Sequence, residues 1–338
     1  MSYTTIATQF TDRDYRVLRG LFESRVMTLQ HIAALYFAGN LDAAQKRIWK
    51  LKNARMLTER TRQRPYDPSI LYLTRHGFEN LVREERLIDY PTIGWPIMKK
   101  RISVSPLTLQ HELDVMTVKA AMFSTFNDTT GYKIPEFSTW PRLFAFPSKT
   151  ILTDGYARRV WIKPDAFMRI RQIDPDGFDA TEHLFYLELD RSTEPQPRLQ
   201  AKAGAYAGYY RSGGMAKRFG APAEAYEAFP FRVLIVCRTA ERRNNIAAAM
   251  LTRRPPILTM VWLCTMDELC QSALSAIWIR PVDYREATSG TEFDPYRAVN
   301  ETVYKRQIAR EEHVESVIKK SNLFPPAESG QDRSGQTL

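Results

Sequence analysis

Three acidic residues lie at the ends of two strand-like segments of this chain. Asp165 opens the segment 165–171, and Glu188 and Asp190 close the segment 183–190. Because side chains alternate along a strand, Glu188 and Asp190 share one face. Antiparallel pairing of the two segments would bring Asp165 beside them. The sequence therefore predicts three carboxylates at one end of a sheet.

This predicted carboxylate cluster is suited to a divalent cation. Clustered carboxylates repel one another unless a cation lies between them. Mg²⁺ (or Mn²⁺) fits because it is a hard ion bound by a few carboxylates and several waters. Held by Asp165, Glu188 and Asp190, it would activate water and stabilise charge on a cleaved phosphodiester. Lys202, on the next predicted helix, is the candidate basic partner.

Each of these residues also has a purely structural interpretation. Asp165 follows a proline, and Asp is a common turn or cap residue. The two acids at the other strand end can pair with Arg191 or Arg198, and Lys202 can be a solvated helix residue. The residues alone leave the catalytic and the structural roles open.

The segments around the acidic residues alternate between helix and strand. A turn at Asp174-Pro-Asp-Gly177 joins the two acidic segments into a hairpin. Hydrophobic periodicity predicts helices at 107–126, 197–211 and 240–251, and strands at 133–139, 158–163, 231–237 and 257–264. This order predicts an α/β (α+β) domain over 107–281, with a mixed sheet flanked by helices.

A second set of candidate functional residues is basic and lies near the N-terminus. Between positions 46 and 64 the chain has eight basic residues and one acidic residue, Glu59. Such a concentration is typical of a surface that meets DNA phosphates. Trp49 lies among these charges and is interpreted as a packing residue. The predicted DNA contacts are Lys46, Arg47 and Lys50 on a helix, and Arg60, Arg62 and Arg64 on a hairpin.

The elements that carry these charges follow the order of a winged helix-turn-helix. Helix starts are predicted at Thr11 and Thr28, and a third helix runs over 41–55. Two strand-like segments, 57–64 and 69–74, then form a hairpin. We expect residues 10–86 to place the third helix and the hairpin on double-stranded DNA. A docking module for an acidic protein is the alternative.

Composition limits the class of protein. The 338 residues suffice for two domains, and the net charge of +10 favours an acidic partner. Three cysteines without CxxC spacing argue against a disulfide framework and a zinc site. There is no secretion-type leader and no apolar run of about 20 residues, so we expect a cytoplasmic protein that does not enter a membrane.

Two further regions lack a clear hydrophobic pattern. Residues 87–106, with several prolines around Lys99-Lys100-Arg101, are predicted to be a linker. Residues 282–322 are predicted to be a charged helical extension, with an exposed helix in 296–320. The tail, 323–338, is polar, and we expect disorder from Pro325 onward.

The carboxylate segments also resemble a known motif. Pro164-Asp165 and Glu188-Leu189-Asp190 are similar to the PD-(D/E)xK motif of restriction-endonuclease-like nucleases. The motif has Lys where this chain has Asp190, and the resemblance implies that Lys202 substitutes for it. Over roughly 10–265 the chain resembles the bacterial replication-relaxation family, which includes mobilisation relaxases of the MOBC type. Further points of resemblance are Thr11-Asp-Arg-Asp14, Tyr72-Leu-Thr-Arg-His-Gly77, His111-Glu112-Leu113, Glu188-Leu-Asp-Arg-Ser-Thr193 and Tyr206.

The resemblance implies a DNA-binding protein of a plasmid or mobile element that acts in replication, relaxation or mobilisation. Its implied partners are double-stranded DNA and other mobilisation or replication proteins, with a homodimer where the DNA site is palindromic. Two activities stay open. One is a metal-dependent DNA nickase with a restriction-endonuclease-like domain. The other is a non-catalytic regulator or replication accessory protein with a degenerate nuclease fold.

Overall fold

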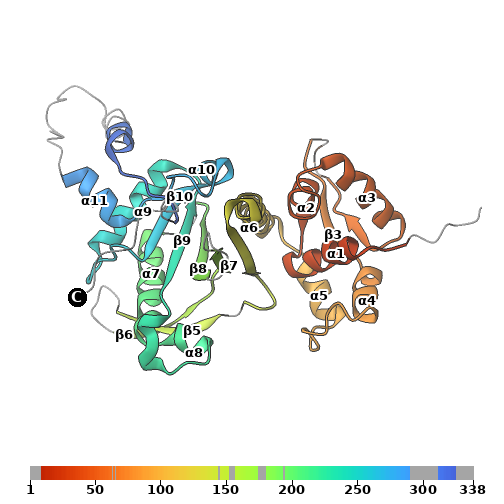
Figure 1. Ribbon diagram of the computed structural model, residues 1–338, viewed down its shortest axis with the longest axis horizontal. Helices are drawn as coiled ribbons and strands as arrows, with labels where there is room; N and C mark the ends of the chain where they lie inside the picture. The colour runs from red at the N-terminus through yellow and green to blue at the C-terminus, as the bar shows by residue number, and fades with distance from the viewer. Residues whose placement is uncertain are drawn as a thin grey trace, which may run out of the picture. The chain divides into compact units, whose positions relative to one another are not determined.

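A computed structural model describes residues 9–62, 64, 66–143, 145–151, 157–173, 180–192, 195–289 and 311–324. The protein has an α+β fold, as the sequence predicted (Figure 1). It divides into two compact units. The first comprises Met1–Phe146 and Trp161–Leu189, and the second comprises Pro147–Val160 and Asp190–Leu338.

The first unit begins with three helices and a hairpin, in the order expected from the sequence (Figure 1). The helices are α1 (Asp12–Ser24), α2 (Leu29–Tyr36) and α3 (Leu41–Asn53). The strands are β1 (Met27–Thr28), β2 (Leu57–Glu59) and β3 (Ile70–Leu73), and they form an antiparallel sheet in the order β1-β3-β2. Helix α4 (Arg75–Arg83) follows.

Side-chain caps fix where these helices begin. The Thr11 backbone N–H and hydroxyl donate to the Asp14 carboxylate at 2.6 and 2.8 Å. Thr28 accepts from the His31 N–H at 3.2 Å, and Asn40 accepts from the Ala43 N–H at 2.9 Å. The bonds from the Thr11, His31 and Ala43 N–H groups satisfy backbone donors that a helix start leaves unpaired. The helix starts predicted at Thr11 and Thr28 are therefore confirmed.

The predicted linker, residues 87–106, is wrong over most of its length. Helix α5 (Trp95–Ile102) forms there, and Leu87, Tyr90 and Met98 are buried in the hydrophobic core of the first unit. Pro96 lies in the first turn of α5, where a missing N–H costs nothing and the fixed φ favours a helix. The proline that indicated a break in the sequence therefore begins a helix.

Helix α6 (Pro106–Thr125) also belongs to the first unit, although the sequence placed it in a second domain. His31 Nε2 on α2 lies 3.0 Å from the Thr117 hydroxyl on α6. Arg25 Nη1 lies 3.1 Å from the Glu112 carboxylate. These contacts tie α6 to the N-terminal helices, so residue 107 does not begin a separate unit.

The strands of the main sheet lie in the order β10-β9-β8-β7-β4. In the first unit, β4 (Tyr132–Ser138), β7 (Ala166–Ile173) and β8 (Ala180–Asp190) pair antiparallel. In the second, β9 (Phe231–Cys237) and β10 (Val261–Thr265) pair in parallel. The sheet is mixed, and the β7–β8 hairpin is confirmed. Its predicted turn at 174–177 lies outside the described residues.

The remaining elements lie around this sheet. Strands β5 (Phe146–Ile151) and β6 (Ala157–Ile162) form a separate two-stranded sheet. The helices are α7 (Gln196–Arg211), α8 (Gly214–Arg218), α9 (Ala240–Thr252), α10 (Met266–Gln271) and α11 (Pro281–Ser289). Two short 3₁₀ turns span Asp128–Thr130 and Ala223–Ala228. In the residues that the structure describes, no helix combines the length and apolarity needed to cross a bilayer.

The C-terminal segment is packed rather than exposed. Residues 311–317 are helical, as predicted, but Val314 and Ile318 are buried. Leu323 and Phe324, assigned to the tail from sequence, are buried as well. The exposed helix is therefore wrong in this segment, because apolar residues among the charges give it one buried face. Residues 318–320 are not helical, and residues 296–310 of that predicted helix and the tail from position 325 lie outside the described residues.

Candidate functional site

Helix α3 presents one apolar face and one polar face. Ala44, Ile48 and Leu51 are buried in the core of the first unit. Lys46, Lys50 and Asn53, at helical spacing on the other side, are exposed. Neither lysine has an ion-pair partner among the described residues. The helix thus holds two cations and an amide at its surface.

Trp49 lies on this exposed face. Its side chain is 63% exposed, so the prediction that it packs is wrong. The reason is geometric, because the buried stripe of α3 passes through Ile48 and Leu51 and the tryptophan lies outside it. An exposed indole beside lysines is able to stack on or pack against a nucleic acid.

Arg47, predicted to contact DNA, is half-buried and already paired within the protein. Its guanidinium is paired with the fully buried carboxylate of Asp14, with Nε donating to Oδ1 at 2.6 Å. It also donates to the Gln9 carbonyl at 2.9 Å. Burial raises the pKa of Asp14, but the bonds from Arg47 and Thr11 outweigh it and hold that pKa below its ordinary value. The ion pair therefore joins α3 to α1.

We predict that Arg47→Met lowers the free energy of unfolding by more than it weakens the free energy of DNA binding. The substitution removes charge-assisted bonds to the buried Asp14, which are worth about 1.5–3 kcal/mol each. Bonds from Thr11 remain, so we expect a loss of about 2 kcal/mol in the free energy of unfolding. Urea denaturation measures it. Unchanged stability together with a large loss of DNA binding would show that Arg47 faces DNA instead.

The hairpin carries the other predicted DNA contacts, Arg60, Arg62 and Arg64. These arginines differ in whether they are already bonded within the protein. Arg60 donates from Nη1 to the Val104 carbonyl at 2.8 Å. Glu59 is paired with Arg62 at 2.9 Å and with Lys52 at 2.7 Å. Burial raises the pKa of Glu59, but the bonds from Lys52 and other neighbours outweigh it and bring that pKa to about 2. Arg64, near the hairpin tip, is exposed with no ion pair among the described residues.

Asp165 lies directly before β7, opposite the end of β8. Its N–H donates to the Leu187 carbonyl at 3.0 Å, and its Oδ2 accepts from the Leu189 N–H at 2.8 Å. Because Ala166 is paired with Leu187, the next position opposite Asp165 is Glu188, which is buried. The structure thus places two of the three predicted carboxylates at facing strand positions.

The second carboxylate oxygen of Asp165 is paired with a histidine. His111 Nε2 on α6 lies 2.9 Å from Asp165 Oδ1. The bond to Asp165 raises the pKa of His111 above its ordinary value, and burial opposes this rise. The sequence singled out the segment containing His111, but it gave no sign that the ring reaches the strand end.

Asp190, the third predicted carboxylate, is paired with Arg242 at the start of α9. Arg242 Nε lies 2.6 Å from Oδ2, and Nη2 lies 3.1 Å from Oδ1. In the part of the chain that the structure describes, no three His, Cys, Asp or Glu side chains form a group able to hold a metal. The expected three-carboxylate cluster is therefore not formed there. Lys202 lies half-buried in α7 of the second unit.

The roles of Asp165, Glu188, Asp190 and Lys202 as metal ligands or catalytic groups stay predictions. The carboxylate oxygens are the donors that Mg²⁺ prefers. In this structure Arg242 is paired with Asp190 and His111 is paired with one oxygen of Asp165, so a metal bound by all three carboxylates would have to displace both partners. Sequence reasoning missed both basic partners, since each comes from a helix more than 50 positions away along the chain.

Comparison with known proteins identifies the family. The model of a family described as replication-relaxation matches residues 18–221, which is more than half of the chain. This protein belongs to the replication-relaxation family. The match covers α3, the hairpin and the Asp165 region of this replication-relaxation protein, and it ends before β9. No curated protein and no solved structure matches. Membership suggests a role in replication or relaxation, and it confirms the resemblance inferred from the sequence.

Proposed function

We propose that this replication-relaxation protein binds double-stranded DNA of a plasmid or mobile element, through a winged helix-turn-helix formed by α1–α3 and the β2–β3 hairpin. In this proposal it acts during replication, relaxation or mobilisation. The proposal depends on the exposed face of α3, where two lysines that form no ion pair with the described residues lie beside a solvent-facing tryptophan.

The geometry of α3 supports contact with a major groove. Its apolar stripe is buried, so the opposite face is free to enter a groove about 12 Å wide. Lys46 and Lys50 would meet phosphates, which set position rather than sequence. Asn53 supplies an amide of the kind that reads adenine edges. Arg64 on the hairpin would meet the adjacent backbone.

Salt dependence of binding tests this proposal. Each neutralised phosphate lowers the logarithm of affinity by about 0.9 per tenfold rise in salt. Lys46, Lys50 and Arg64 form no ion pair with the described residues, so the full chain should show a slope of about −3 in fluorescence anisotropy with a labelled duplex. No duplex binding at low salt would refute the proposal and favour the docking of an acidic protein.

We predict that Glu59→Gln strengthens DNA binding. The change removes the carboxylate that pairs Lys52 and Arg62, so both cations become available to phosphates. We expect duplex affinity to rise by at least about threefold to tenfold and the salt slope to steepen by about 0.9 for each of the two cations that reaches a phosphate. Glu84→Gln is the matched control, because Glu84 is an exposed carboxylate that pairs only with its neighbour Arg83 among the described residues. An equal gain for both variants would indicate a general charge effect.

DNA nicking is the second candidate function, and the facing positions of Asp165 and Glu188 favour it. Supercoiled plasmid carrying the cognate origin should then be nicked in Mg²⁺ or Mn²⁺. Asp165→Ala and Glu188→Ala should each reduce nicking by at least 100-fold, on the order of one catalytic group. If the wild type is as inert as both variants, the non-catalytic regulator is the correct alternative.

The number of protein copies on the DNA is a further part of the proposal. A palindromic site would bind two copies related by the symmetry of the site. Analytical ultracentrifugation of the protein with a labelled duplex measures this stoichiometry. Other mobilisation or replication proteins are the further partners that the proposed role requires.

A further inference from the structure

A cavity of about 410 Å³ in the first unit is lined by basic side chains. Arg25, Lys100 and Arg101 contribute three cations, and Ser105 and Thr108 contribute hydroxyl groups. Among the described residues that line it, none is acidic. Its volume lies within the range of about 300–1,000 Å³ that is typical of ligand pockets. The lining is therefore suited to an anion.

Arg101 is the most unusual residue in this lining. Its guanidinium stacks on the Trp140 ring at 3.6 Å from the ring centroid. Its Nε is buried with no hydrogen-bond partner, and no side chain or carbonyl in the described part of the chain accepts a hydrogen bond from it. Burying a guanidinium donor without an acceptor is costly. Stacking fixes the plane of the group but satisfies none of its N–H donors.

Arg25 also has a guanidinium N–H donor that is not hydrogen-bonded within the described residues. One of its nitrogens lies 3.1 Å from the Glu112 carboxylate, but its Nε is also buried without a partner. Burial, and then the nearby charge of Arg25, lower the pKa of Arg101 to about 9, and Glu112 only partly offsets this. The two guanidinium groups therefore repel each other, and Glu112, which pairs with Arg25, is not among the described residues that line the cavity.

The cavity adjoins the predicted DNA-binding hairpin. Val104 lines the cavity, and its carbonyl accepts the 2.8 Å hydrogen bond from Arg60, which follows β2. Val104 also packs in a small apolar cluster with Ile70 and Tyr72 of β3. A nucleic-acid strand on the hairpin would therefore pass close to the cavity mouth.

We propose that this cavity binds the phosphate of a nucleotide, with Arg25 and Arg101 donating to its oxygens. Lys100 adds a third cation, and the Ser105 and Thr108 hydroxyls, which lie 3.0 Å from each other in the cap of α6, make the lining polar beside it. The nucleotide is either a unit of a DNA strand or a free monophosphate. The first source rests on the proposed DNA-binding function, whereas the second is independent of it.

Calorimetric titration of the full chain with three probes tests the proposal and separates the sources. The probes are inorganic phosphate, thymidine 5′-monophosphate and a short duplex. Arg101→Gln removes the unpaired cation. If the phosphate comes from a DNA strand, this variant lowers duplex affinity by about tenfold and reduces the salt slope by about 1. If it is free, the variant lowers affinity for the monophosphate or for inorganic phosphate by about tenfold and leaves duplex affinity unchanged.

Lys100→Gln serves as a second variant, because its exposed side chain is outside the core and its loss should not affect folding. It should weaken the same probe as Arg101→Gln, by about threefold to tenfold. Lys217→Gln, an exposed lysine in α8, is the control and should change none of the affinities. If neither Arg101→Gln nor Lys100→Gln changes binding of any probe, the cavity is not a phosphate site. A wild type that binds no duplex but binds the monophosphate would refute DNA binding while supporting the cavity.

Discussion

Replacing Lys46 and Lys50 together by alanine is expected to weaken duplex DNA binding by roughly 60-fold at about 0.1 M salt. Both side chains are exposed on α3 and have no ion-pair partner among the described residues. Two lost phosphate contacts reduce the salt slope by about 1.8. The buried stripe of α3 is unchanged, so the free energy of unfolding should change by less than about 0.5 kcal/mol. Anisotropy over a series of salt concentrations measures the first two quantities.

The matched control is Lys217→Ala with Lys319→Ala. Both lysines are exposed in the second unit, and the double change removes the same net charge. We expect the control to reduce affinity by less than about threefold, since neither lysine belongs to α3 or to the hairpin, and exposed charges outside the contact surface are largely screened. If both double variants lose affinity equally, the DNA surface is not on α3. The proposal for the cavity would survive, because its monophosphate arm does not involve these lysines.

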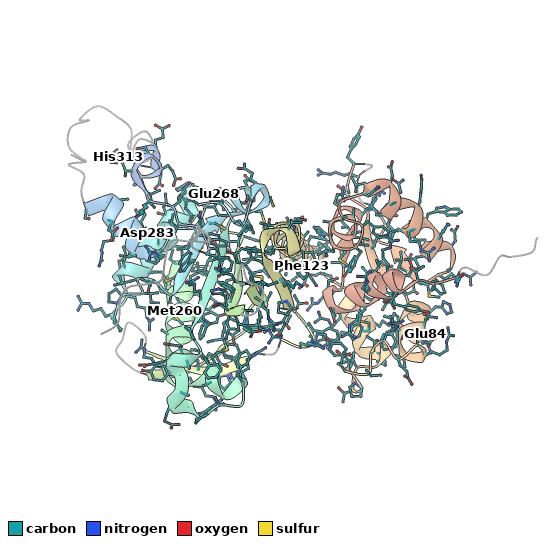
Figure 2. All side chains as sticks on the ribbon, in the orientation of Figure 1. Glu84, Phe123, Met260, Glu268, Asp283 and His313 are labelled. Carbon is teal, nitrogen blue, oxygen red and sulfur yellow. The ribbon has the colours of Figure 1, made fainter. Side chains whose placement is uncertain are left out.

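Arg243→Met is expected to lower the free energy of unfolding by about 3 kcal/mol. Arg243 on α9 is fully buried, and its guanidinium is paired with Glu315 and lies 3.1 Å from Glu268 (Figure 2 labels Glu268). It also donates to Asn244 at 3.2 Å. Methionine fills a similar volume but leaves the carboxylates without their central cation. Because both acids are partly exposed, water compensates for some of the loss.

This network also makes stability dependent on pH. Burial raises the pKa of Glu268, but bonds from Lys320 and Thr265 and the charge of Arg243 outweigh it and lower that pKa below its ordinary value of 4.5. A lowered pKa stabilises the fold above about pH 4.5, and this contribution is lost as the pH falls through the folded-state pKa. The wild type should therefore lose more stability than Arg243→Met on acidification below pH 4.5.

Urea denaturation at pH 7 and below pH 4.5 measures both effects. Arg238→Met is the control, because Arg238 is exposed at the end of β9 and has no ion pair in the residues described. It should change stability by less than about 0.5 kcal/mol. Equal stabilities for Arg243→Met and Arg238→Met would show that the network does not hold the C-terminal segment. A cooperative unfolding transition of Arg243→Met at a lower urea concentration than that of Arg238→Met would support the role of the network.

The sequence by itself determined much of the order of elements and many of their boundaries, although it did not predict α5 or β5. The caps at Thr11 and Thr28 and the apolar stripe of α3 lie within one or two helical turns, so their pattern is visible locally. The β7–β8 hairpin follows from alternation on either side of a short turn. These signals depend on backbone geometry over a few residues, so a short stretch of sequence is enough to specify them.

Only the tertiary structure decided which charged residues are paired within the protein and which are available to contact DNA or another ligand. Arg47 and Lys46 are neighbours on one basic helix, yet Arg47 turns to Asp14, which is 33 positions away. Asp190 meets Arg242 across 52 positions, and the apparent linker around Arg101 folds onto Trp140. The physical reason is that a buried charge is costly unless it is paired. A buried charge therefore pairs with a group that the fold brings close to it, however far apart the two residues are in the sequence.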